Sequence, residues 1–89
     1  MKPSFRKLYR IGEIMRYTGL SRQTVHNYTV IGLITEAERT DGHQRLYDEE
    51  TFERLARIAA LKEQGKTLRE IREILEAEHA GSRGRESSI

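Results

Sequence analysis

Apolar residues recur at helical spacing in four stretches of the chain, which are separated by glycines and polar turn residues. The spacing predicts helices over about 12–17, about 21–30, 49–64 and 68–79. The apolar residues that indicate these four helices are, in chain order, Ile11, Ile14 and Met15; Val25 and Tyr28; Phe52, Leu55, Ile58 and Ala59; and Leu68, Ile71, Ile74 and Leu75. The chain is therefore predicted to be mainly α-helical, with about four helices.

The break between the first two helices is short and contains a glycine. Gly19 can adopt a positive φ, and Ser21 is a good N-cap for a second helix that Gly32 can end. Two short helices joined by a tight glycine-containing turn have the spacing of a helix-turn-helix. The second helix is then the candidate recognition helix.

The segment between the second and third helices contains a turn signal. Asp41-Gly42 separates residues that can pair as strands, and we expect a small hairpin of 37–39 with 45–47. A plain loop is the alternative. A short β-prone stretch, LYRI, precedes the first helix. Further along, Asp48 can cap the third helix, Gly65 can end it, and Thr67 with Glu70 forms a capping box for the fourth.

One face of the second helix is polar. With Val25 in the core and 100° per residue, Gln23 and Asn27 point outward, and His26 and Val30 lie between the two faces. Amide side chains can pair with an adenine edge, a histidine can donate or accept, and the flanking Arg22 can meet phosphate. The pattern favours DNA recognition, and a plain solvated helix face is the alternative.

The hairpin tip carries a second polar group. His43, Gln44 and Arg45 on a glycine turn would form a cationic wing able to grip phosphates or enter a minor groove. The alternative for Arg45 is a salt bridge to a nearby acid. Tyr47 is expected to pack its ring and offer its hydroxyl to the backbone.

Charge is distributed unevenly along the 89 residues. Residues 1–47 hold eight Lys or Arg against four acids (+4), whereas residues 48–89 hold eight against ten (−2). A basic N-terminal half suits a polyanionic partner. The chain has no cysteine, no membrane-length apolar run and no signal-peptide pattern, so we expect a cytoplasmic, nucleoid-associated protein.

Nothing in the sequence favours catalysis. His26, His43 and His79 fall in three different elements, without paired spacing for a metal, and no phosphate loop or nucleophile motif is present. The acids of the last two helices are expected to pair with bases one turn away, as in Glu53–Arg57 and Arg69–Glu73. We therefore expect no enzymatic activity, no catalytic residue, no metal and no cofactor.

Several segments together resemble the DNA-binding domain of MerR-family transcriptional regulators. They are YRIGEIMRYTGLSRQTVHNY, IGLI, RTDGHQRLYDEETFERLARI and LKEQGKTLREIREIL, from about Tyr9 to Leu75. The resemblance implies a winged helix-turn-helix, with the second helix in the major groove and the wing, 39–47, on the DNA backbone. It implies DNA contacts from Arg22, Thr24, Tyr28, Arg45 and Tyr47.

The chain also departs from the family pattern. His26 stands where the family usually has a phosphate-binding arginine, and Asn27 stands where it usually has an aromatic residue. We therefore expect these two residues to contact bases more than phosphates. Family members usually continue into a dimerisation helix and an effector region, and we expect both to be missing from these 89 residues. We expect either a piece of a longer regulator or a short stand-alone relative. The expected organisation is a flexible basic lead-in (1–8), the winged-helix domain (9–79) and a disordered tail (80–89).

The resulting prediction is a sequence-specific binder of double-stranded DNA that regulates bacterial transcription. Promoter or operator DNA would be its partner, RNA polymerase a further one, and copies would meet as a homodimer or side by side on DNA. The predicted DNA-binding residues are Arg22, Gln23, Thr24, His26, Asn27, Tyr28, His43, Gln44, Arg45 and Tyr47. A helical protein–protein adaptor and a recombination or architectural accessory protein are the alternatives.

Overall fold

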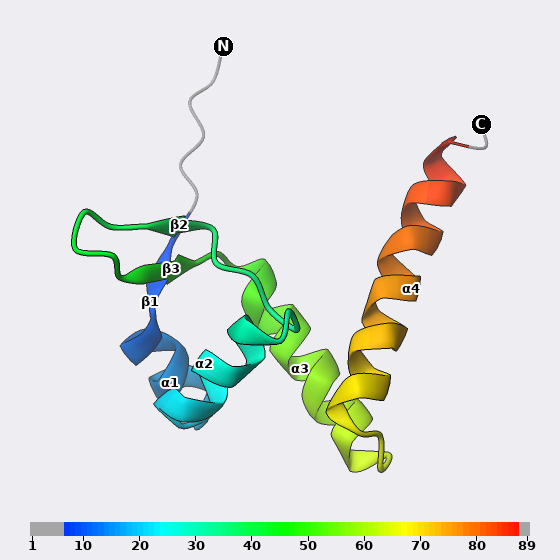
Figure 1. The fold of residues 1–89 in the computed structure, drawn as a ribbon, viewed down its shortest axis with the longest axis horizontal. Coiled ribbons are helices and arrows are strands. Elements are labelled where there is room, and N and C mark those ends of the chain that lie inside the picture. The colour runs from blue at the N-terminus through cyan, green and yellow to red at the C-terminus, as the bar shows by residue number, and fades with distance from the viewer. Residues whose placement is uncertain (1–6, 88–89) are drawn as a thin grey trace. The chain divides into compact units, whose positions relative to one another are not determined.

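The computed structural model describes the backbone of residues 7–87 and the side chains of residues 7–78. In chain order the elements are β1 (Tyr9–Arg10), α1 (Ile11–Thr18), α2 (Arg22–Val30), β2 (Glu38–Arg39), β3 (Arg45–Tyr47), α3 (Glu50–Glu63) and α4 (Leu68–Ser87) (Figure 1). The chain forms two compact units, residues 1–56 and 57–89, and their boundary falls inside α3. Most of the predicted lead-in, 1–6, lies outside the described residues.

The helix-turn-helix predicted from the sequence is confirmed. Gly19 ends α1 with φ 79°, a left-handed conformation that glycine adopts without strain from a Cβ. Ser21 caps α2, since its hydroxyl oxygen accepts the backbone N–H of Thr24 at 3.1 Å. The two helices pack against each other. Local sequence signals therefore fix both the turn and the start of the candidate recognition helix.

The predicted hairpin is also present, and it belongs to a larger sheet. β2 and β3 pair antiparallel, with Arg39 opposite Arg45. β1, the β-prone stretch before α1, pairs antiparallel with β3, so that Tyr9 lies opposite Tyr47 and the strand order is β1-β3-β2. The sheet thus anchors the hairpin to the start of α1, and the fold is a winged helix-turn-helix with four helices and three strands in the described chain.

A small core holds the first unit together. Its buried apolar side chains are Ile14, Val25, Tyr28, Leu33, Ile34, Tyr47 and Leu55. Tyr9, Tyr17 and Phe52 pack edge to face beside it, with ring centroids 4.8 Å apart for Tyr9–Phe52 and 5.8 Å for Tyr17–Phe52. Arg54 of α3 donates from Nε to the carbonyl of Leu33 at 2.7 Å. These contacts tie α1, the sheet and the start of α3 into one unit.

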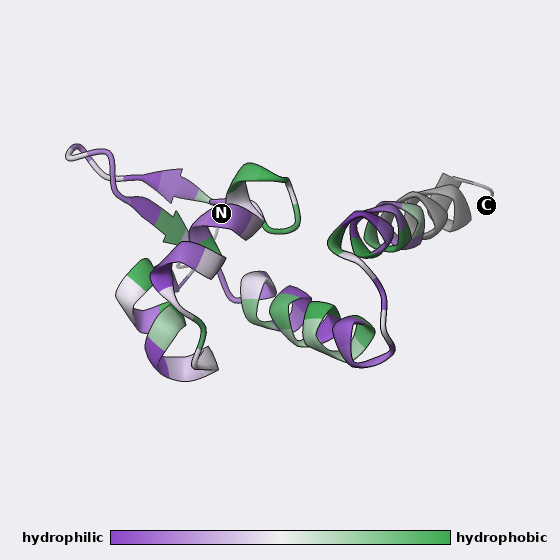
Figure 2. Ribbon diagram, turned by 60° about the horizontal axis from the view of Figure 1, so that its bottom comes forward, coloured by the Kyte–Doolittle hydropathy of each residue, from purple (hydrophilic) through white to green (hydrophobic). Residues whose placement is uncertain are grey.

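The second unit contains the end of α3 from residue 57, the turn that follows, and α4. Ile58, Leu61, Ile71 and Leu75 are its buried side chains, and hydrophobic and hydrophilic residues alternate around α3 (Figure 2). The predicted capping box is present: Thr67 N–H donates to Glu70 at 2.9 Å, and Glu70 N–H donates to Thr67 Oγ1 at 3.1 Å. No helix in the described part of the chain has the length and apolarity needed to cross a membrane.

Two expectations for this unit differ from the structure. Arg57 pairs with Glu78, at 2.5 Å between Nη2 and Oε2, and not with Glu53 one turn earlier, whereas the predicted Arg69–Glu73 pair is present at 3.8 Å. Arg57 reaches Glu78 on α4, although Glu53 lies one turn away on its own helix. α4 continues to Ser87, beyond the expected end near residue 79 and into the segment expected to be a disordered tail.

Candidate nucleic-acid interface

The outward face of α2 carries exposed side chains that can hydrogen-bond. Arg22, Gln23 and Asn27 are exposed, as the helical geometry predicted. Gln23 Nε2 donates to Asn27 Oδ1 at 3.0 Å, a hydrogen bond that favours one relative orientation of the two amides. The pair still presents the Gln23 carbonyl oxygen and an amide N–H from each residue. This surface therefore offers hydrogen-bond donors and acceptors side by side.

Other predicted contact residues of α2 are less accessible. Thr24 is half-buried, and its hydroxyl lies 2.9 Å from the Ser21 hydroxyl in the N-cap. Tyr28 is only 4% exposed, so its ring packs inward as expected. Val30 at the end of the helix is 64% exposed. Arg22, Gln23 and Asn27 are thus the α2 side chains most available to a ligand.

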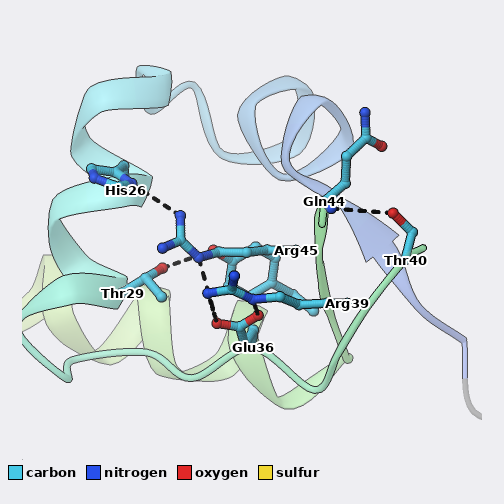
Figure 3. A network of polar contacts seen from close by, with 8 residues as sticks. His26, Thr29, Glu36, Arg39, Thr40, Gln44 and Arg45 are labelled. Atoms are coloured by element: carbon cyan, nitrogen blue, oxygen red, sulfur yellow. Dashed lines mark hydrogen bonds and ion pairs between the residues drawn. The ribbon is translucent and has the colours of Figure 1, made fainter. Parts of the chain in front are cut away.

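The wing tip, residues 40–44, is exposed and tightly turned. Thr40 N–H donates to the carbonyl of Gln44 at 2.9 Å, and Gln44 N–H donates to Thr40 Oγ1 at 3.1 Å (Figure 3). His43 adopts φ 64°, an uncommon conformation for a residue with a Cβ. These bonds hold the turn, and they leave the side chains of His43 and Gln44 exposed at the tip.

The arginines at the base of the wing are engaged within the protein (Figure 3). Arg39 donates to both carboxylate oxygens of Glu36, at 2.5 and 3.0 Å. Arg45 Nε lies 3.5 Å from Glu36 Oε1, an ion pair whose geometry leaves this buried N–H without a hydrogen bond among the described residues. The hydrogen bond from Arg39 holds the pKa of Glu36 below its usual value. Partial burial raises this pKa, whereas the charges of Arg39 and Arg45 lower it further.

Arg45 also contacts the recognition helix. Its Nη1 lies 3.0 Å from Nδ1 of His26. Both residues are half-buried. The salt bridge that was the alternative interpretation of Arg45 is therefore present, and it is accompanied by a contact to α2 that the sequence did not indicate.

Tyr47 lies deeper than a DNA-contacting residue would. The side chain has no exposed surface, and its hydroxyl lies 2.7 Å from Thr29 Oγ1, not against the backbone as expected. Thr29 donates its own proton to the carbonyl of Val25 at 2.9 Å, so Tyr47 must be the donor to Thr29. Tyr47 thus joins β3 to α2 inside the protein and does not reach a ligand from this position.

A basic cleft lies between α1, α2 and the wing. It is open to solvent and encloses about 500 Å³. Its charged or titratable lining residues are Arg10, Glu13, Arg16, Arg22, His43 and Arg45. Among the described residues, Arg10, Arg16 and Arg22 have no ion-pair partner, so the cleft carries a positive excess. Arg10 and Arg16 were not among the predicted contact residues, although both belong to the basic N-terminal half.

Comparisons with known proteins agree on one family. The family model described as MerR HTH family regulatory protein matches residues 9–78. Nodulation protein NolA of Bradyrhizobium elkanii is 45% identical over 71 residues, which cover 80% of this chain and 32% of NolA. The mercuric resistance operon regulatory protein of Bacillus cereus is 40% identical over 67 residues, which cover 75% of this chain and 51% of that protein.

A solved structure supports the same assignment. The N-terminal part of the Bacillus subtilis multidrug transporter activator, MtaN, matches with a TM-score of 0.72 and 37% identity. The match covers 75% of this chain and 63% of that one. The chain spans between about a third and a half of the two curated relatives above.

Proposed function

The chain belongs to the MerR family of helix-turn-helix regulatory proteins, and from this premise we propose that it binds double-stranded DNA sequence-specifically and regulates transcription. In this proposal α2 lies in the major groove and the wing lies on the phosphate backbone. The observation that carries it is the basic cleft, which adjoins α2 and is lined by Arg10, Arg16 and Arg22, three arginines without an ion-pair partner among the described residues. The adaptor alternative is not favoured, because it gives this cleft no role.

The cleft suits one strand of the DNA backbone. A strand that separates the major groove under α2 from the minor groove under the wing would pass between these two elements. Arg10, Arg16 and Arg22 line that path and can contact phosphates, and the exposed His43 and Gln44 at the wing tip extend it. Arg45 would contribute less charge, since it lies in an ion pair with Glu36.

Base reading is assigned to the amide pair of α2. Glutamine and asparagine can each pair bidentately with an adenine edge in the major groove. Because Gln23 and Asn27 are hydrogen-bonded to each other in the free protein, this orientation of the two amides is favoured before DNA binds. Less side-chain entropy is then lost on binding. Thr24 and Tyr28 would support this helix from its inner side, and Tyr47 would position it through Thr29.

The biological setting is proposed from the relatives. Curated matches include an operon regulatory protein and transcriptional activators, so we assign promoter or operator DNA as the partner, RNA polymerase as a further partner, and the cytoplasmic nucleoid as the location. Two copies would bind together, as a homodimer or side by side on repeated sites.

Selection from a random duplex library, followed by a salt titration on the selected site, tests the proposal. Enrichment of one motif together with a steep salt dependence is expected. The double variant Gln23→Ala/Asn27→Ala should still bind, with relaxed preference at the bases under α2. An absence of any enriched motif, with binding equally weak on all duplexes, would contradict the proposal.

A further inference from the structure

The contact between Arg45 and His26 determines which nitrogen of the histidine carries a proton. A guanidinium has five N–H donors and no acceptor, so Arg45 Nη1 can only donate. With 3.0 Å between Nη1 and Nδ1, the ring nitrogen must accept through its lone pair. An imidazole that accepts at Nδ1 is neutral and carries its single proton on Nε2.

The second ring nitrogen is left for a ligand. The two nitrogens of an imidazole point in divergent directions, so that Nε2 faces away from the wing arginine when Nδ1 faces it (Figure 3). Among the described residues Nε2 has no hydrogen-bond partner. His26 adjoins Asn27 on α2, next to the exposed amide pair. The helix therefore presents one N–H donor of fixed identity beside two amides.

We propose that Arg45 positions His26 as a neutral Nε2–H donor, and that this donor reads the acceptor edge of a guanine in the major groove. Guanine presents two adjacent acceptors there, N7 and O6. Adenine keeps N7 but replaces O6 with an amino donor, thymine presents the single acceptor O4 beside its methyl group, and cytosine presents only a donor. This inference rests on the proposed DNA binding. His26 is its specificity-determining residue, and Arg45 acts through His26 as a positioning residue.

Glu36 and Arg39 complete the arrangement. Glu36 lies 3.5 Å from Nε of Arg45, and its carboxylate also binds Arg39. The carboxylate holds the Arg45 side chain against α2, with its Nη1 directed at His26. Arg39 shares the same carboxylate but has no contact with His26 in the described structure, so it offers a matched control of equal charge.

The first experiment needs no DNA. Long-range ¹H–¹⁵N NMR on the free chain at neutral pH reports which ring nitrogen is protonated, with assignments from His26→Asn and His43→Asn. In the wild type, His26 is expected to carry its proton on Nε2 alone. In Arg45→Met, His26 is expected to become a mixture of the two tautomers, and in Arg39→Met its tautomer is expected to stay as in the wild type. A protonated Nδ1 in the wild type, or an Arg45→Met spectrum identical to it, would overturn the positioning role.

The second experiment uses the duplex selected from the random library. Each guanine is replaced in turn by 7-deazaguanine, which lacks N7, and by adenine. At one guanine, wild type should lose about 5- to 10-fold in affinity, the worth of one hydrogen bond, with 7-deazaguanine if N7 is the acceptor or with adenine if O6 is the acceptor. His26→Asn, whose amide occupies the position of Nδ1, should show no further loss there, while His26→Gln, whose amide reaches the position of Nε2, should retain part of the preference.

The outcomes distinguish DNA binding by the protein from base reading by His26. No enriched duplex overturns the DNA proposal and base reading with it, while the NMR result still decides the role of Arg45. An enriched duplex without a guanine under α2, or equal losses in wild type and His26→Asn at every guanine, overturns base reading by His26 and leaves the DNA proposal standing.

Discussion

Replacing the three arginines of the basic cleft by glutamine is expected to flatten the salt dependence of DNA binding. Arg10, Arg16 and Arg22 line the cleft without ion-pair partners among the described residues, so each can release a counterion when it meets a phosphate. Each contact contributes about 0.9 to the slope of log K against log salt, and the three together about 2.7. Over a fourfold rise in salt, wild type should therefore lose ~40-fold more affinity than the triple variant.

The assay is a fluorescence-anisotropy titration of the selected duplex at several salt concentrations. Arg69→Gln/Arg72→Gln is the control: both arginines are exposed on α4, pair only with neighbouring acids and lie outside the cleft. This control should keep the wild-type slope. Arg45→Gln should change the slope by less than 0.9, since Glu36 already offsets part of the charge of Arg45.

A triple variant whose slope equals that of wild type would contradict this role of the cleft. A flattening of the slope in the α4 control as large as that in the cleft variant would contradict it too. In the first case the cleft does not contact the backbone, and in the second the chain responds to net charge alone. Circular dichroism on each variant verifies that the helices remain folded.

Three further predictions concern stability. Tyr47→Phe removes the donor to Thr29 in the core and should lower the free energy of unfolding by about 0.5–1.5 kcal/mol, measured by urea denaturation; an unchanged midpoint would contradict the contact. Glu36→Gln should destabilise the protein at neutral pH because it leaves Arg39 and Arg45 without their carboxylate. The pKa of Glu36 is lowered from 4.5 in the folded state, so this difference should persist above pH 4.5 and shrink as pH falls further; a pH-independent difference in thermal unfolding would argue against the ion pairs. Gly19→Ala places a Cβ at φ 79° with no neighbour to clash with, so about 1–2 kcal/mol of backbone strain is expected, and a neutral effect would contradict the left-handed turn.

Local signals in the sequence were sufficient for the turns and the helix starts, although not for the end of α4. The glycine at 19, the Ser21 cap and the Thr67–Glu70 capping box each act within a few residues, and the structure contains all of them. The Asp41-Gly42 turn likewise indicated the hairpin. Helical periodicity correctly separated buried Val25 from exposed Gln23 and Asn27, because burial on a short helix follows the angle around its axis.

What the sequence could not supply are contacts between distant residues. Arg45 meets His26 and Tyr47 meets Thr29, 19 and 18 positions apart, and no local spacing encodes either contact. The packed ring of Tyr47 was predicted, but its hydroxyl, which was expected at the backbone, is buried against Thr29. Arg10 and Arg16 were missed for the same reason, since they line a cleft with α2 and the wing only after β1 has paired with β3.

The bond between Tyr47 and Thr29 and the contact between Arg45 and His26 limit how this surface can be redesigned. Positions 26 and 29 of α2 serve the wing as well as the helix, so transplanting a foreign recognition helix would separate both contacts from their partners. The side chains at positions 23 and 27 bond only to each other within the described chain and can vary independently of the fold. Altered operator preference should therefore be accessible through two residues alone, whereas wider changes require compensating substitutions at 45 and 47.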